Sequence, residues 1–381
     1  MSSVEPLAQL GPTSEPDLAV DKATASAFVV RRYQSVDSLP PQFGPLFERA
    51  EAHSFDLSLD WFRHLCATAL KADESVQLFT AESQASGESL AVMGFRQEAG
   101  TRQLRALATF YSSLYAPICR DRDAAGAVRA IFEHLAHQSV PSVSLQPLEF
   151  GSENYTLLRD AIEAADWSVF EFFCTGNWFV PTAGLNYEDY AKRLPSQLRN
   201  TIKRKRNRLL RSAGRVEVVT GGDGLEAAIA AYDKVYRASW KVPEPFPEFM
   251  PGLIRLCSAR GWLRLGLVHV GDEPAAAQMW IVNAGRASIY KLAYDAKFAE
   301  FSAGSVLSDH LTQHVLEVDR VREIDYLTGD DAFKQDWMTD RRERWGIVAY
   351  NRRSLAGLTG AAAEYARRLV KKIRPQRKAV D

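Results

Sequence analysis

The chain has 381 residues, and its 47 Lys and Arg residues balance 47 Asp and Glu residues, so the formal net charge at pH 7 is zero. Hydrophobic residues make up 46% and charged residues 25%, which is typical of a globular protein and excludes a wholly disordered or collagen-like chain. The length predicts two or three domains. Zero net charge argues against a protein that binds nucleic acid over its whole surface.

The sequence shows neither a membrane span nor a secretion signal. No run of 18 or more uncharged apolar residues is present. The first 26 residues are rich in Ser, Pro, Ala and acids and lack a basic, apolar leader, so we expect a mobile tail. The four cysteines are widely spaced without a C-x-x-C pair, which predicts reduced thiols in the cytoplasm and no zinc site. They are Cys66, Cys119, Cys174 and Cys257.

Hydrophobic periodicity in the first half predicts strands and helices in the order β-α-α-β-β-β-α-β-α-β. The expected strands are 28–33, 76–80, 90–95, 104–115, 143–150 and 169–180, and the expected helices are 42–52, 60–70, 124–138 and 155–166.

The same order returns after a polar helix pair at 187–213. The expected strands are 216–220, 263–270, 275–283, 287–294, 324–327 and 346–350, and the expected helices are 223–240, 249–259, 305–318 and 333–337. Two matching orders predict a duplicated α/β fold, with a tail (1–26), a first domain (27–181), a basic helical linker (182–214), a second domain (215–353) and a basic C-terminal helix (354–381).

Five motifs in the second half carry a family resemblance. They are Ala275–Trp280, Tyr290–Asp295, Phe301–Leu307, Asp325–Asp330 and Phe333–Trp337. With the element order, they resemble the GNAT acetyltransferases of the cellulose-biosynthesis type, which are similar to the Fem peptidyltransferases. The resemblance implies two GNAT-like domains in tandem, each a mixed sheet flanked by helices. Two positions depart from the family: Ala303 replaces the Pro of a Ser-Pro-Gly loop, and Phe333 replaces a Tyr.

A loop that leads directly into a helix is the candidate cofactor site. A helix N-terminus offers unpaired N–H groups and a favourable dipole for phosphate. The resemblance implies that this loop binds the pyrophosphate of acetyl-coenzyme A or another acyl-coenzyme A. The alternative is an ordinary Ser-capped helix. The loop residues are Ser302, Ala303, Gly304, Ser305 and Val306.

Acyl transfer to an amine requires removal of a proton, stabilisation of an oxyanion and protonation of the leaving thiolate. Asp330, after a predicted strand, is the candidate base or acceptor-binding group. Lys334 is expected either to balance Asp330 as an i,i+4 pair or to contact a phosphate. Tyr290 is the candidate proton donor, with core packing as the alternative.

Further residues are candidates for binding the acceptor. Trp240, Lys241 and Trp337 are expected to line its pocket, although Trp240 also fits the apolar stripe of its helix. Lys291 is a further candidate in a strand, and Asp295 follows that strand as either a ligand for the substrate or a turn cap. His310 and His314 have i,i+4 spacing but no third ligand near them in sequence, so we expect no metal.

Two segments are strongly basic. Between Arg199 and Arg215 lie eight Lys and Arg residues and no acid, which indicates either a solvated helix face or a site for a phosphate-bearing ligand. The C-terminal helix, 358–374, is basic and partly amphipathic, which is compatible with weak membrane-surface association.

The predicted function is transfer of an acyl group, expected to be acetyl, to an amine or hydroxyl of a small molecule, sugar or cell-envelope precursor by a monomer or homodimer. The alternatives are Fem-like aminoacyl transfer from charged tRNA and non-catalytic binding of a polysaccharide precursor or nucleic acid.

Overall fold

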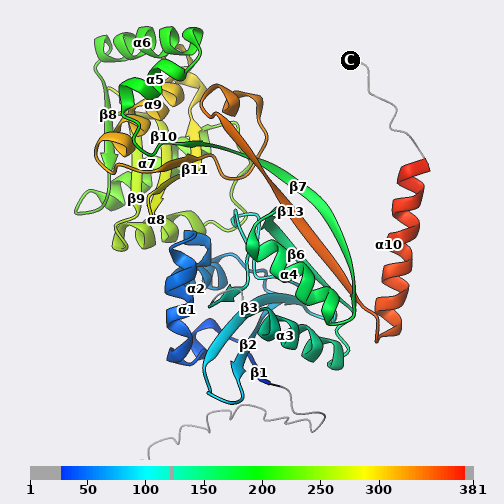
Figure 1. Ribbon diagram of the computed structural model, residues 1–381. Helices are drawn as coiled ribbons and strands as arrows, with labels where there is room; N and C mark the ends of the chain where they lie inside the picture. The colour runs from blue at the N-terminus through cyan, green and yellow to red at the C-terminus, as the bar shows by residue number, and fades with distance from the viewer. Residues whose placement is uncertain (1–26, 121–123, 374–381) are drawn as a thin grey trace, which may run out of the picture.

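The structure, a computed structural model, describes residues 27–120 and 124–373. The predicted tail 1–26 and the last eight residues lie outside this range. The described residues form one mixed sheet in the strand order β1-β2-β3-β4-β6-β13-β7-β12-β11-β10-β9-β8, with β5 paired to β3. Figure 1 shows two lobes, with α1–α4 on one and α5–α9 on the other, joined by the long strands β7 and β13.

The first half follows the predicted order, with one additional two-residue strand, β5. Its strands are β1 (Phe28–Tyr33), β2 (Glu74–Ser83), β3 (Ser89–Glu98), β4 (Leu104–Ala106), β5 (Ile118–Cys119), β6 (Ser142–Glu149) and β7 (Trp167–Pro181). Its helices are α1 (Gly44–Glu51), α2 (Leu59–Thr68), α3 (Ala125–His137) and α4 (Glu153–Ala164), with short 3-10 turns η1 (Val36–Ser38), η2 (Pro41–Phe43) and η3 (Phe55–Leu57).

The second half repeats that order after two polar helices, except that the last short helix is a 3-10 turn. Its strands are β8 (Gly214–Val219), β9 (Leu263–Val270), β10 (Glu273–Asn283), β11 (Arg286–Tyr294), β12 (Glu323–Asp325) and β13 (Asp340–Asn351). Its helices are α5 (Tyr187–Arg193), α6 (Ser196–Arg211), α7 (Leu225–Ala238), α8 (Phe249–Ala259), α9 (Ala303–Glu317) and α10 (Leu355–Ile373), with 3-10 turns η5 (Ala296–Phe301) and η6 (Ala332–Asp336).

The two halves exchange their last strands. β13 lies between β6 and β7 and pairs antiparallel with both, although it comes from the end of the second half. In turn, the end of β7 pairs with β12, from Pro181↔Glu323 to Phe179↔Asp325. Each half of the sheet therefore contains a strand from the other half.

A shared hydrophobic core also joins the halves. Trp61 of α2 packs edge-on against Phe249 of α8, with ring centroids 5.9 Å apart, and against Tyr290 of β11 at 6.1 Å. One buried cluster contains residues of α1 and α2 together with residues of α7, α8 and β9–β11. Burying large aromatic rings is strongly favourable, so this contact is a major source of stability.

Two expected strands differ in extent from the observed ones. Only Leu104–Ala106 of the expected strand 104–115 is a strand, because side chains bind the backbone of the remainder: Asp56 accepts from the Ser113 N–H at 3.1 Å. Conversely, β13 begins at Asp340 and not at residue 346. Its first residues are charged, and they remain in the sheet because β7 pairs with them.

Candidate functional site

The sheet of the second half splits between β11 and β12. These parallel strands pair only from Arg286↔Glu323 to Ser288↔Asp325, while β11 continues to Tyr294. Beyond β12 the chain follows β7 instead, since the Tyr326 N–H donates to the carbonyl of Trp178 at 2.9 Å. Among the described residues, positions 289–294 of β11 therefore have no strand partner on this side. Such an edge offers backbone donors and acceptors to an extended ligand.

The N-terminus of α9 lies next to the end of this open edge. Ser302 precedes the helix in the left-handed region (φ 47°, ψ 46°), and its side chain makes no capping hydrogen bond. The first turn closes through the Val306 N–H, which donates to the carbonyl of Ser302 at 3.1 Å. The alternative of an ordinary Ser-capped helix is therefore wrong. A Cβ atom on Gly304 would lie 3.4 Å from Cδ1 of Tyr294, so the loop backs directly onto the end of β11.

An exposed aromatic pair stands beside this loop. Trp240 is 60% exposed, and its ring centroid lies 4.5 Å from that of Tyr294. The Lys241 ammonium lies 5.7 Å from the Trp240 ring. The chain leaves α7 at Ala238, so Trp240 does not continue the buried stripe of that helix. The alternative of a core role for Trp240 is wrong.

A partly buried ion pair connects the open edge to the loop between α7 and α8. Lys291 of β11 donates from Nζ to Oε1 of Glu244 at 2.8 Å, and the Tyr111 hydroxyl donates to Oε2 at 2.7 Å. Burial alone would raise the pKa of Glu244, but the hydrogen bonds from Lys291, Tyr236 and Tyr111 outweigh it and hold that pKa below its ordinary value. Glu244 therefore stays ionised at neutral pH.

Sequence reasoning missed Glu244 and Tyr111. The available signal for Glu244 was a single acid held between Pro243 and Pro245, which fix the loop. Tyr111 gave no such signal because its surroundings read as a strand. Lys291, predicted as a substrate ligand, is a member of this cluster.

Tyr290 is not positioned as the predicted proton donor. The register of β10 and β11 shifts between Met279↔Lys291 and Trp280↔Ile289, so Tyr290 is the extra residue of a β-bulge. Its ring packs against Phe55 and Trp61, and its hydroxyl donates to the carbonyl of Tyr111 at 2.8 Å. Burial raises the pKa of Tyr290 well above its ordinary value. Core packing, the alternative reading, is the one observed.

Asp330 lies on the other side of the split, and its carboxylate accepts hydrogen bonds from two side chains. Arg341 donates from Nη2 to Oδ2 at 2.7 Å and from Nε to Oδ1 at 3.0 Å, and Trp178 donates from Nε1 to Oδ1 at 2.8 Å. The hydrogen bonds from Arg341, followed by that from Trp178, hold the pKa of Asp330 below its ordinary value. A carboxylate with a lowered pKa is a weak general base.

Lys334 makes a different ion pair from the predicted one. Its ammonium lies 3.3 Å from Oδ2 of Asp331 and donates to the carbonyl oxygens of Thr328 at 2.7 Å and Gly329 at 3.2 Å. Burial lowers the pKa of Lys334, although the carboxylates around it act in the opposite direction. The i,i+4 pair with Asp330 does not form, because Arg341 occupies that carboxylate.

Two other predicted ligands do not face the split. Trp337 is only 7% exposed, lies in the core beside α9 and accepts a hydrogen bond at its carbonyl from the Tyr190 hydroxyl at 3.0 Å, so its predicted pocket-lining role is corrected. Asp295 accepts from the Lys297 N–H at 2.8 Å and thereby caps η5, which is the turn-capping alternative.

The basic helix α6 packs beside η5 and the N-terminus of α9. Arg206 pairs with the buried Asp309 of α9, and Arg208 pairs with Glu300, two residues before Ser302. Lys203 and Arg204 are exposed on the same helix. Part of the basic run is therefore structural, and part remains available to an anionic ligand.

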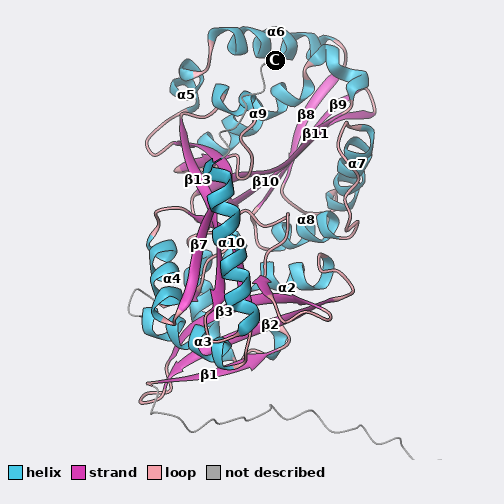
Figure 2. Ribbon diagram, turned by 90° about the vertical axis from the view of Figure 1, so that its right-hand side faces the viewer, coloured by secondary structure: helices cyan, strands magenta, loops and turns pink. Residues whose placement is uncertain are grey.

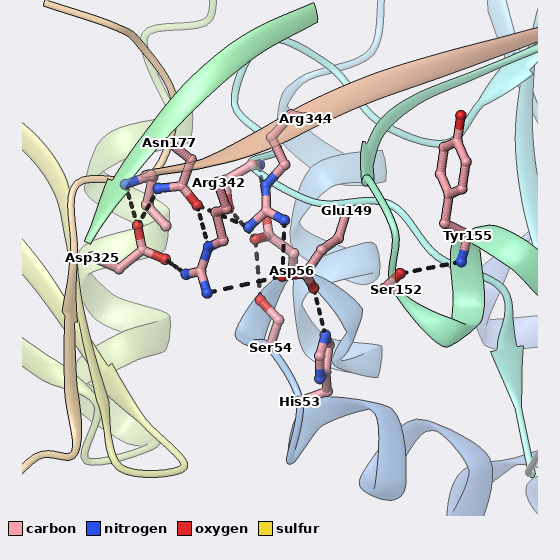
Figure 3. Close-up of polar contacts among 12 residues, drawn as sticks. His53, Ser54, Asp56, Glu149, Ser152, Tyr155, Asn177, Asp325, Arg342 and Arg344 are labelled. Carbon is pink, nitrogen blue, oxygen red and sulfur yellow. Dashed lines mark hydrogen bonds and ion pairs between the residues drawn. The ribbon is translucent and has the colours of Figure 1, made fainter. Parts of the chain in front are cut away.

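A buried polar network connects the strands at the point where the split between β11 and β12 begins (Figure 3). Arg342 of β13 donates to Oδ1 of Asn177 at 2.7 Å and to Glu323 at 2.8 Å, and it also pairs with Asp325. The Arg342 guanidinium therefore joins β13, β7 and β12. Burial raises the pKa of Asp325, but nearby Arg342 and Arg344 outweigh this effect and hold it below its ordinary value.

The same network reaches the first half through Glu149. This carboxylate lies 3.4 Å from His53 Nε2 and 3.4 Å from Arg344 Nη1. The hydrogen bond with His53, together with the nearby arginines, lowers the pKa of Glu149 to about 2.

Asp56 is a buried acid close to this network (Figure 3). It is 1% exposed and accepts from the Ser113 N–H at 3.1 Å and from the Ser54 hydroxyl at 3.3 Å. Burial raises the pKa of Asp56 to about 6, although the hydrogen bonds from Ser113 and the charge of Arg344 oppose the shift. The pKa of Asp56 therefore lies close to neutrality.

A pocket of about 240 Å³ adjoins this network, between His53–Phe55 and the turn Asn283–Arg286, and Glu323 also lines it. Arg286 begins β11 and Tyr294 ends it, so this pocket is at the opposite end of the strand from the N-terminus of α9. No group of three or more His, Cys, Asp or Glu side chains suited to a metal occurs in residues 27–120 and 124–373. Over the same ranges, no helix has the length and apolarity needed to span a bilayer.

Residues 196–335 match a family model described as an acetyltransferase (GNAT) domain. The chain contains a GNAT-type acetyltransferase domain. The matched region begins with α6 and includes the α9 loop, both sides of the split and Lys334. The protein is an acyltransferase enzyme, and no curated protein sequence gives a match to it.

Solved structures extend the GNAT-like fold over both halves. The crystal structure of FemX matches with TM-score 0.57 and 10% identity, covering 84% of this chain and 97% of that chain. The C-terminal domain of a candidate lysylphosphatidylglycerol synthetase from Agrobacterium fabrum matches with TM-score 0.51 and 12% identity, covering 85% and 96%. Such low identities establish similarity of fold alone. With the repeated element order, they confirm the predicted GNAT-like α/β fold.

Proposed function

We propose that the protein transfers an acyl group, acetyl in the simplest case, from acyl-coenzyme A to an amine or hydroxyl. The observation that carries this proposal is the meeting of the open β11 edge, residues 289–294, with the uncapped N-terminus of α9. The pyrophosphate would bind the N–H groups of Ala303, Gly304 and Ser305, where the helix dipole favours negative charge. The pantetheine arm, which carries amide groups, would extend along β11.

The chemical groups would come from both sides of the split. Lys334 is held by two carbonyl oxygens and would stabilise the oxyanion or the leaving thiolate. Glu244 stays ionised and would orient the acceptor together with Lys291. Asp330 is bound to Arg341, so we propose it as an acceptor-binding group and not as the base.

The proposal extends to the type of domain, the acceptor and the place where the protein acts. The domain would be of the cellulose-biosynthesis type, since Gly329, Asp330, Lys334 and Trp337 occur in the order of that motif. Trp240, which is exposed beside the loop, would contact a sugar or cell-envelope precursor. The protein would act in the cytoplasm as a monomer or homodimer.

Charged tRNA is the second candidate donor. Lys203 and Arg204 are exposed on α6, beside the phosphate loop, and basic side chains that contact a nucleic-acid backbone give salt-dependent affinity. The fold similarity to FemX is compatible with this alternative.

Calorimetry and thermal shift with acetyl-coenzyme A, longer acyl-coenzyme A species and charged tRNA test these alternatives. We expect saturable binding of an acyl-coenzyme A that Gly304→Trp abolishes. Gly304→Ala is the matched control, because its Cβ atom would meet Tyr294 at an ordinary contact distance of 3.4 Å and should leave binding intact. If no coenzyme A species binds, the main proposal is wrong, and binding of charged tRNA alone would favour the second candidate.

A further inference from the structure

Helix α10 lies along the outer side of β7 and β13, away from the helices that cover the two lobes (Figures 1 and 2). Its contacts with the body use one face. Gly357, Ala361 and Glu364 are buried on this face, and Arg368 donates from Nη2 to the carbonyl of Glu171 at 2.8 Å. The protein-facing side of α10 is therefore made of small residues and an ion pair between Glu364 and Arg368 at 2.8 Å.

A second face of α10, next to the protein-facing one, is apolar and largely open to solvent, although the Tyr365 ring also packs against Phe170 with ring centroids 4.7 Å apart. Leu355, Leu358, Tyr365 and Leu369 follow one another at intervals of three, seven and four residues, with Ala362 between the middle two, so they share one side of the helix. Their exposed fractions run from 50% to 79%. A helix on a globular protein ordinarily turns its apolar stripe inward, so this orientation indicates a surface that another body covers.

The charge of the C-terminal segment indicates which kind of partner covers the apolar face of α10. Residues 352–381 contain nine Lys and Arg residues and two acids. Arg352, Arg353, Arg367 and Lys371 are exposed within the described part of this segment. A helix with exposed apolar side chains on one side and cations on the other suits the boundary of an anionic bilayer, where the apolar side chains enter the acyl region and the positive charge of the segment is attracted to the lipid headgroups.

A second copy of the chain fits less well. The spacing of the apolar residues would suit a two-helix interface, in which the flanking positions are Thr359, Ala361, Ala366 and Arg368. None of these is an acid, so no charge pair would offset the repulsion between two basic helices. We propose that α10 docks this enzyme on an anionic membrane surface.

Co-sedimentation of the full-length protein with vesicles tests the proposal. Vesicles of phosphatidylcholine are compared with vesicles that also contain phosphatidylglycerol. We expect binding to the anionic vesicles that falls roughly tenfold or more in Leu358→Glu/Leu369→Glu and declines with salt. Arg367→Gln/Lys371→Gln should weaken binding to anionic vesicles only. Leu210→Glu is the matched control, because Leu210 is also an exposed leucine on a basic helix and should bind as the wild type does.

Light scattering and circular dichroism complete the experiment. Every variant should keep the wild-type spectrum and melting temperature, because the substituted side chains are exposed. Equal vesicle binding by the wild type and Leu358→Glu/Leu369→Glu overturns the proposal. So does a wild-type dimer that this variant dissociates without any vesicle binding, since the second copy would then be the occupant. These readouts do not depend on the acyl donor.

Discussion

The ammonium of Lys291 lies 2.8 Å from Oε1 of Glu244, so the open edge of β11 is tied by an ion pair to the loop between α7 and α8. Tyr111 joins the same carboxylate from the first half of the chain. The proposed acceptor site is therefore built by both halves, and its charge depends on a carboxylate that three donors keep ionised.

Glu244→Gln tests this arrangement. The amide keeps the hydrogen bond from Tyr111 but leaves the Lys291 cation without a counter-charge, which we expect to cost ~1.5–3 kcal/mol of transition-state stabilisation. In assays of thiol release, kcat/KM for an acceptor amine should fall roughly tenfold to a hundredfold, while the affinity for acyl-coenzyme A stays unchanged. Glu273→Gln removes an exposed ion pair with Lys297 and is the control. Normal kinetics in Glu244→Gln would show that Glu244 takes no part in binding the acceptor.

Asp330→Asn separates acceptor binding from base catalysis. Arg341 holds the pKa of Asp330 below its ordinary value, so this group does not titrate near neutrality. The variant should lower turnover with little change in donor affinity, and the acid limb of the pH profile should stay in place. Asp336→Asn, an exposed acid of the same segment, is the control. Disappearance of that limb would make Asp330 the base, and normal turnover would make it a structural partner of Arg341.

Asp56 predicts a pH dependence of stability. Its pKa is about 6 in the folded state against an ordinary 3.8. Between these pH values the unfolded chain releases the proton first, so the folded state loses stability as pH rises through this window, by ~3 kcal/mol in total. Asp56→Asn keeps a hydrogen-bonding group but cannot ionise. Relative to the wild type, its free energy of unfolding should therefore rise by about this amount between pH 4 and pH 7.

Chemical denaturation across that range measures the difference. Asp160→Asn, at an exposed position, should show a flat difference and serves as the control. A flat difference for Asp56→Asn as well would mean that folding does not raise the pKa of this carboxyl.

Arg342→Met tests the network at the base of the split. The change removes the counter-ion that pairs with the buried Asp325, while the partly buried Glu323 keeps its second partner, Arg286. Breaking a buried pair typically costs about 3–5 kcal/mol. The free energy of unfolding should fall by this order. Arg352→Met removes an exposed pair with Asp166 and should cost about 1 kcal/mol or less. Equal losses in the two variants would show that the network contributes no more than a surface ion pair.

Much of the fold was predictable because each half repeats apolar periodicities of helix and strand. The position of the α9 N-terminus was predictable to within two residues, although the helix begins at Ala303 and not at Ser305, and η5 lies between it and β11. The first residues of β13 were missed because Arg341, Arg342 and Glu343 lack the apolar pattern of a strand. Pairing with β7 and buried polar partners hold that segment in the sheet, and neither is local in sequence.

The reactive side chains were harder to predict for the same reason. Tyr290 has the residue type of a proton donor, but a β-bulge and the facing Trp61 place it in the core. Glu244 was missed because its partners, Tyr111 and Lys291, lie more than 40 residues away. Asp330 was predicted as a site residue, but its partner Arg341, which lowers the pKa of the Asp330 carboxyl, was not predicted.

The exchange of β7 and β13 also sets an order of events during synthesis. β13 fills the place between β6 and β7, so the first half cannot complete its sheet until the ribosome has added residues 340–351. A nascent chain released before Asp340 would carry two unpaired strand edges, and such edges promote aggregation. Pulse proteolysis of fragments that end at residue 339 and at residue 354 should show this contrast, with protection of the first half appearing only in the longer fragment.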